Sequence, residues 1–286
     1  MTRRNMKGTA GWCALLAAVL TILSCGNPQH STDDNNGTDA VPENRETAVP
    51  EQLAPIGDTT LAGTGLKVAV FSETALKNRH ENLYLKLTHA DSSPVTGADV
   101  SFSPFMDMGM MSHAAPYVQP KELAAGWYRG SVVFIMADAA DMGSGWLLDV
   151  MVPGEGATDS LRFKLPVEEA AVTRTMAIDA TEGRFFLSLL MPDSVPAGAH
   201  KAAFMLHGID HDAFPATDGY TIRLETYMPD MGHGSSDNQD ARGKGDGYYE
   251  GRIDLSMAGL WEIRATLHKD GRKVSADPIV FKIHSK

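Results

Sequence analysis

The chain has 286 residues, and its 36 acidic residues outnumber its 25 lysines and arginines, which gives a formal net charge of -11 at pH 7. Such an acidic chain lacks the basic face that nucleic-acid binding requires, so we expect no nucleic-acid partner. Its two cysteines are too few for a disulfide framework or a thiolate zinc site, and the fold must depend on a hydrophobic core.

Residues 1–24 predict a cleavable signal peptide. Three basic residues precede an apolar run from Trp12 to Leu23, which is shorter than the roughly 20 residues that cross a bilayer core. The run ends in Ile22-Leu23-Ser24-Cys25, which resembles the bacterial lipobox and implies cleavage before Cys25 and lipid on that cysteine. The alternative is an ordinary signal peptide with a chance cysteine. We expect a lipoprotein of the bacterial cell envelope, held at a membrane through Cys25 on the periplasmic face or the cell surface.

Residues 25–57 are polar and poor in aliphatic side chains. Such a segment buries too little apolar surface to offset the entropy of ordering it, which predicts a lipidated cysteine followed by a flexible tether. Removal of the leader, which holds three basic residues and no acidic ones, lowers the formal net charge to -14.

The rest of the chain alternates apolar and polar residues with the period of a β-strand. Trp261, Ile263, Ala265 and Leu267 alternate with polar residues, and similar alternation recurs around Leu85, Phe163 and Phe281. Turn-forming residues separate the runs, and no long helical pattern is present. The pattern predicts an all-β chain of antiparallel sandwiches.

The β region is an internal repeat. Gly126-Trp127-Tyr128-Arg129-Gly130 matches Gly247-Tyr248-Tyr249-Glu250-Gly251, and each segment is followed by a methionine, then by a glycine and a tryptophan. Upstream, Phe105–Met110 matches Tyr227–His233 with one proline dropped. The order predicts two related tandem sandwiches, at 58–168 and 172–286.

Both halves resemble the YtkA-like domain, which is related to the FixH-like periplasmic domains. The residues that carry the resemblance in the second copy are Pro215-Ala216-Thr217, Met228-Pro229-Asp230-Met231-Gly232-His233, the Gly247–Gly251 hairpin and Met257-Ala258-Gly259-Leu260-Trp261. The first copy departs, because Met110 stands where the second has His233. The resemblance implies an immunoglobulin-like sandwich on exported or membrane-tethered proteins, some of them tied to copper handling.

Clustered methionines and histidines suggest metal chemistry. Thioether is a soft ligand that favours Cu(I), and imidazole binds both common copper oxidation states. The candidate ligands in the second copy are Met228, Met231, His233 and Met257. The weaker set in the first copy is Met106, Met108, Met110, His113 and Met136.

Packing offers an alternative explanation for the same residues. Met257 follows the phase of Tyr249, and Met136 follows that of Tyr128, so both could point into a core without any metal. The segment from Met228 to Gly232 could equally be a rigid turn that caps the sandwich.

Two functions remain open. One is a membrane-anchored lipoprotein that binds copper for sequestration or delivery. The other is a non-catalytic module that presents sandwich loops to an envelope protein partner. We find no credible arrangement for nucleophilic catalysis and expect no enzyme.

Overall fold

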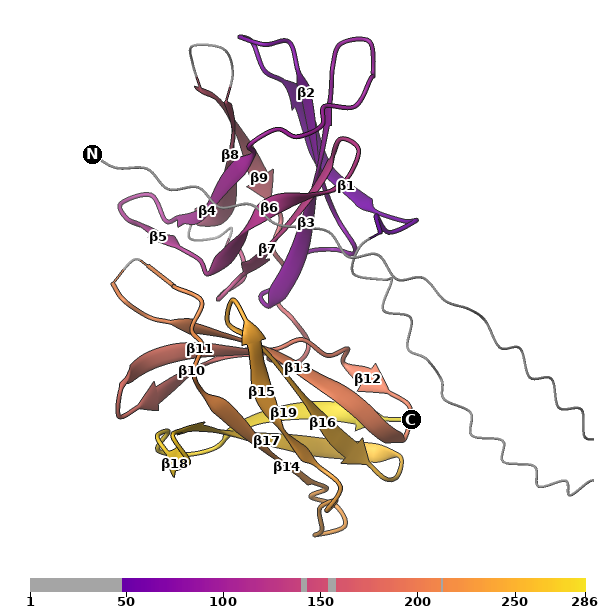
Figure 1. Ribbon diagram of the computed structural model, residues 1–286, viewed down its shortest axis with the longest axis vertical. Coiled ribbons are helices and arrows are strands. Elements are labelled where there is room, and N and C mark those ends of the chain that lie inside the picture. Colours follow the sequence, from indigo (N-terminus) through magenta and orange to yellow (C-terminus); the bar gives the residue numbers. More distant parts are fainter. Residues whose placement is uncertain (1–47, 140–142, 154–157, 212) are drawn as a thin grey trace, which may run out of the picture. The chain divides into compact units, whose positions relative to one another are not determined.

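The computed structural model describes residues 48–139, 143–153, 158–211 and 213–286. The leader, Cys25 and most of the tether lie outside these residues. Every element in the described chain is a β-strand (Figure 1), which confirms the all-β prediction. None of the described residues forms a helix long and apolar enough to cross a membrane.

The first sandwich consists of two sheets. The strand order in one is β1-β2-β3-β7-β6, and in the other it is β5-β4-β8-β9. The bounds are β1 (Ala54–Thr60), β2 (Lys67–Ser72), β3 (His80–Thr88), β4 (Ser101–Asp107), β5 (Ser112–Ala114), β6 (Tyr117–Ala124), β7 (Trp127–Val133), β8 (Gly145–Pro153) and β9 (Thr158–Leu165).

Strand β1 begins inside the segment 25–57 that the sequence assigned to the tether. Its backbone pairs with β2 from Ala54 to Thr60, and the Ile56 side chain packs against the core of the first sandwich. The tether prediction therefore extended too far. Ile56 is the one large aliphatic residue of β1, which is too weak a pattern to predict a strand, although it suffices for an edge strand whose partner supplies the hydrogen bonds.

The second sandwich is built from one continuous sheet. Its strand order is β10-β11-β13-β16-β15-β14-β17-β19-β12, with β18 beside β17. The bounds are β10 (Thr175–Ala180), β11 (Gly183–Leu189), β12 (Ser194–Val195), β13 (Gly198–Gly208), β14 (Thr221–Tyr227), β15 (Gln239–Gly245), β16 (Tyr248–Leu255), β17 (Gly259–Lys269), β18 (Arg272–Lys273) and β19 (Ile279–Ser285). Strand β15 pairs with both β16 and β14, so it connects the two layers. The pairing of β12 with β19 is parallel, an exception to the antiparallel prediction.

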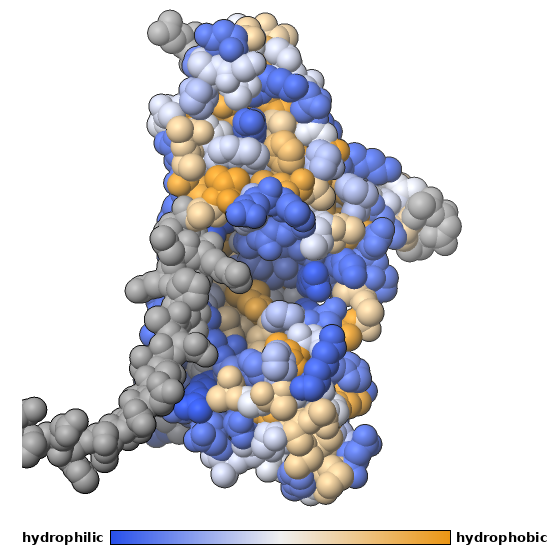
Figure 2. Space-filling model, turned by 90° about the vertical axis from the view of Figure 1, so that its right-hand side faces the viewer, coloured by the Kyte–Doolittle hydropathy of each residue, from blue (hydrophilic) through white to orange (hydrophobic). Residues whose placement is uncertain are grey.

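Each sandwich has its own hydrophobic core. Alternate residues of β4 and β8 are buried, as the period of two requires when one face of a strand meets the opposite sheet. The two cores contain Trp146 and Trp261 respectively, and both indoles are fully buried. Figure 2 shows one face of the molecule, on which hydrophilic residues surround smaller hydrophobic patches.

Equivalent tyrosines tie equivalent loops in the two sandwiches. The Tyr128 hydroxyl donates to the Val95 carbonyl at 3.0 Å, and the Tyr249 hydroxyl donates to the Thr217 carbonyl at 2.9 Å. Both phenols are buried. The shared hydrogen bond explains why the repeat keeps a tyrosine in the middle of each Gly-x-Tyr-x-Gly hairpin.

The hairpin's second glycine is required by a close approach of strands. A Cβ atom on Gly130 would lie 2.6 Å from the Val118 carbonyl oxygen, and one on Gly251 would lie 2.7 Å from the Gln239 carbonyl oxygen. Real Cβ atoms do not come so close to backbone oxygen, so only glycine fits either position.

A buried arginine at the start of the second sandwich makes hydrogen bonds and an ion pair. Arg174 is 1% exposed, and its guanidinium donates to the carbonyls of Lys282 at 2.7 Å and Pro192 at 3.2 Å. It also pairs with Asp193 at 3.1 Å. Burial lowers the pKa of Arg174, and the Asp193 charge opposes that shift. Asp193 lies 3.7 Å from Arg79 of the first sandwich, so one carboxylate contacts both sandwiches.

Candidate functional site: two methionine–histidine–tryptophan rungs

Three chemistry-bearing residues share one rung of the first sandwich. Met106 on β4 is the register partner of His113 on β5 and of Trp146 on β8. Residues directly opposite each other on antiparallel strands face the same side, with Cβ atoms about 4.5–5.5 Å apart. The His113 and Trp146 rings meet edge to face with their centroids 5.3 Å apart. We call these three residues the first rung.

The loop after β7 lies against the first rung. The Trp146 indole N–H donates to the Met136 carbonyl at 2.9 Å, which satisfies the one polar atom of a buried indole. The Met136 side chain itself is 40% exposed. It is therefore not the core residue that its strand phase would have made it, because the chain leaves β7 before reaching it.

The second sandwich repeats this arrangement. Met228 pairs with His233, and the register of β14 with β17 places Met228 opposite Trp261 when continued by one residue. The His233 and Trp261 rings meet edge to face at 6.2 Å. The Trp261 indole N–H donates to the Met257 carbonyl at 3.0 Å. Met228, His233 and Trp261 form the second rung, with Met257 in its facing loop.

His113 is the structural counterpart of His233, and the sequence comparison was wrong to put Met110 in that place. The turn between Met106 and His113 is two residues longer than the turn between Met228 and His233. Comparison of adjacent letters cannot detect such an insertion, whereas the strand register determines it directly. Met110 instead lies at the turn, fully exposed.

The predicted ligands divide into buried and exposed groups. Met106 and Met228 are 1% and 6% exposed, and Met108 packs partly against the first core. Six large hydrophobic side chains are exposed among the described residues, and five of them are methionines: Met110, Met111, Met136, Met231 and Met257. These five lie in the β4–β5 and β14–β15 turns and in the facing loops, beside the two rungs. We call them the methionine tips.

The two histidines share one hydrogen-bonding pattern. His113 Nδ1 lies 3.0 Å from the Ala114 carbonyl oxygen, and His233 Nδ1 lies 3.4 Å from the Gly234 carbonyl oxygen. A carbonyl can only accept, so in the neutral ring Nδ1 carries the proton and Nε2 carries the lone pair. His113 Nε2 is buried and has no hydrogen-bond partner within the described part of the protein.

These rungs offer thioether and imidazole donors without carboxylates. Within the described residues, no group of three or more His, Cys, Asp or Glu side chains could hold a metal ion. A metal at a rung would therefore be bound by sulfur and nitrogen, which suits a soft ion.

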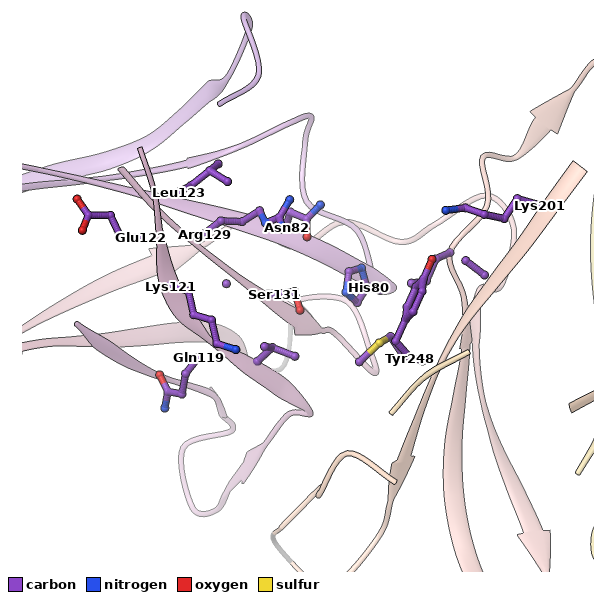
Figure 3. A pocket seen from close by; sticks show the side chains of 15 residues that line it. His80, Asn82, Gln119, Lys121, Glu122, Leu123, Arg129, Ser131, Lys201 and Tyr248 are labelled. Carbon is purple, nitrogen blue, oxygen red and sulfur yellow. The ribbon is translucent and has the colours of Figure 1, made fainter. Parts of the chain in front are cut away.

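A cavity of about 600 Å³, whose lining contains no rung residue, is drawn in Figure 3. His80, Arg129 and Ser131 line it from β3 and β7, and Lys201 and Tyr248 line it from β13 and β16. Burial lowers the pKa of His80 to about 4, with Glu73 opposing and Arg129 adding to the shift. The side chains that line the cavity carry charges of both signs. The Lys201 ammonium already lies 3.4 Å from the Glu250 carboxylate.

His207 on β13 is a buried histidine that sequence reasoning did not single out for its chemistry. Its side chain is 1% exposed, and neither ring nitrogen has a hydrogen-bond partner in the described chain. Burial, together with the smaller effect of the nearby His80, lowers its pKa to about 4. The signal in the sequence was its place directly after the apolar run Ala202–Leu206, where strand alternation puts it on the face opposite Phe204 and Leu206.

Residues 180–266 match the family described as YtkA-like, which covers the second sandwich from the end of β10 into β17. The match supports the resemblance for that copy. No curated protein is significantly similar to the chain.

Several solved β-rich proteins are weakly similar. The Escherichia coli adhesin FdeC is 14% identical over 79% of this chain and 65% of its own, with a TM-score of 0.25. The Yersinia pseudotuberculosis adhesin InvE is 12% identical over 74% and 55%, with a TM-score of 0.24. Domains 5-6 of the S-layer protein SbsC are 10% identical over 81% and 99%, with a TM-score of 0.28. The chain thus spans less than two thirds of each adhesin structure, and scores this low carry no argument about function.

Proposed function

We propose that this chain is a non-catalytic envelope protein whose two sandwiches present their methionine tips to a protein partner. The observation that carries the proposal is that, within the described ranges, five of the six exposed large hydrophobic side chains are tip methionines. Single exposed apolar residues are ordinary, but a group in adjoining loops is typical of an interaction surface. Methionine suits such a surface, because its unbranched, polarizable side chain adapts to different partners.

Cys25 supplies the membrane attachment in this proposal. It lies outside the described residues, so its support is the lipobox-like end of the leader. A lipid on Cys25 and a polar segment of some thirty residues before β1 would hold the sandwiches at a membrane while leaving the tips free to dock.

Site-specific photo-crosslinking in the native host tests the interaction function. A photoreactive residue in place of Met231 should give one discrete adduct, and the same residue in place of Arg223, exposed on β14 of the same sandwich, should not. Replacement of Met257 by Gln should weaken the Met231 adduct, because it removes a neighbouring apolar side chain of the tip. Equal crosslinking from Arg223, or none from Met231, would contradict the proposal.

A second candidate function is copper sequestration or delivery. Its support is that each rung brings one thioether and one imidazole to a tryptophan, with a second methionine in the facing loop. The test is competition by the purified protein for Cu(I) against a chromogenic chelator under anaerobic conditions. Failure to compete would remove this candidate and leave the interaction function untouched.

A further inference from the structure

We propose that the first rung is the tighter of two soft-cation sites, and that His113 Nε2 and Met106 Sδ are its ligands. The ion would be monovalent and thiophilic, of the class of Cu(I) or Ag(I), with Met136 as a third donor from the facing loop. This inference rests on the second function proposed above, and it reverses the order of the two copies that the sequence suggested.

The state of the His113 ring is the first argument. Its Nδ1–H is held by the Ala114 carbonyl at 3.0 Å, which fixes the ring and leaves the Nε2 lone pair available. Metal-binding histidines usually donate their other ring N–H to a carbonyl or carboxylate in this way. Nε2 is buried with no hydrogen-bond partner in the described chain. Buried polar atoms are nearly always paired, so an orphaned acceptor needs an explanation, and a bound cation supplies one.

The strand register supplies the thioether. Met106 is paired across the ladder with His113 on one side and with Trp146 on the other. Its position is fixed by the two strands that flank β4 rather than by a loop. The side chain is 1% exposed, so its sulfur is shielded from water. A ligand pair already fixed by strands loses little freedom on binding.

The facing loop adds a donor that is held in place by its backbone. The Trp146 indole fixes the Met136 carbonyl at 2.9 Å, which keeps this loop against the rung. The Met136 side chain is 40% exposed and remains free to turn toward an ion that enters from solvent.

Two carboxylates beside the rung, among the residues that the structure describes, accept backbone N–H groups. Asp138 accepts the backbone N–H groups of Trp146 at 3.0 Å and Val167 at 3.3 Å. Asp107 accepts the backbone N–H of Gly109 at 2.9 Å. The thioether and imidazole donors of the rung favour a soft ion over Mg²⁺ or Ca²⁺, which prefer oxygen ligands.

The second rung has the same residue types in a looser arrangement. His233 is exposed, and its Nδ1 lies 3.4 Å from the Gly234 carbonyl oxygen, against 3.0 Å in the first rung. The centroids of its histidine and tryptophan rings are 6.2 Å apart, against 5.3 Å. The imidazole of the second rung must therefore be ordered by the ion itself.

The experiment uses the full chain in detergent, with Cys13→Ser and Cys25→Ser so that no thiol competes. Cu(I) is titrated against a chromogenic chelator without oxygen, and Ag(I) serves as a redox-inert probe. Carbon-13 labelling of methionine methyl groups reports which thioethers respond. The first equivalent of Ag(I) should shift the Met106 and Met136 methyl signals before those of Met228 and Met257.

Matched variants show which of the two rungs binds the first equivalent. His113→Gln should weaken binding of the first equivalent by at least the roughly tenfold that loss of an outer-shell partner costs, while His233→Gln should leave it unchanged. Met136→Leu keeps bulk and should also weaken binding, while Met111→Leu should have no effect. If the first equivalent shifts Met228 and depends on His233, copper binding stands but this inference fails. If the parent protein does not compete for Cu(I) at all, the proposed copper function and this inference both fail.

Discussion

Acidification should destabilise the protein through His207. Its imidazole is buried, and both of its ring nitrogens lack hydrogen-bond partners among the described residues. Burial lowers its pKa in the folded state to about 4, whereas the unfolded chain should titrate near the ordinary histidine value of about 6.5. Between these values the unfolded state binds the proton and the folded state does not.

The sign and size of the effect follow from that difference. Above about pH 6.5 the ring is neutral in both states, so the folded state is not penalised. As pH falls below this value, protonation of the unfolded chain lowers the free energy of unfolding, and the loss is complete near pH 4. A gap of about 2.5 pKa units corresponds to roughly 3 kcal/mol, a large part of the stability of an ordinary domain.

Chemical denaturation at pH 8, 6, 5 and 4 measures this loss. His207→Leu removes the titrating ring without breaking a hydrogen bond, so the variant should match the parent or exceed it at pH 8. At low pH it should lose about 3 kcal/mol less than the parent does. The control His284→Leu removes an exposed histidine of β19 and should keep the parent's acid dependence. If the parent and His207→Leu lose stability in parallel, the buried ring is not the cause.

Three further outcomes can be checked. Cys25→Ser should move the protein out of the membrane fraction or leave its leader uncut, and a membrane-bound variant of mature size would rule out the lipid anchor. Trp146→Ala and Trp261→Ala should each lower the free energy of unfolding by about 3–5 kcal/mol, measured by denaturant melts, because both indoles are fully buried. Trp127→Ala should lower it less because Trp127 is half-buried, and equal losses would contradict this ranking. Gly251→Ala should cost about 1–3 kcal/mol, because its Cβ would lie 2.7 Å from a carbonyl oxygen; an unchanged melting temperature would show that β15 can move aside.

The sequence predicted the sandwiches because burial on one face of a strand imposes a period of two. The alternation around Trp261 corresponds to β17, and the two fully buried tryptophans lie at equivalent points of two cores. The Gly-x-Tyr-x-Gly repeat could also be recognised from the sequence. Few other residues could replace a tyrosine that hydrogen-bonds a loop carbonyl, or a glycine where two strands approach closely. Edge strand β1 was missed because its one large aliphatic residue, Ile56, leaves almost no pattern.

The sequence by itself determined the strand periodicity, the internal repeat, and the abundance of methionine and histidine near the repeated glycine and tryptophan motifs. Only the tertiary structure decided which of these residues meet. Strand register placed His113 beside Met106 and Trp146 despite the longer turn, and the end of β7 left Met136 outside the core that its phase predicted. The physical reason is that periodicity is a local property of the chain, whereas ring contacts, orphaned nitrogens and exposed fractions depend on pairings between strands distant in sequence.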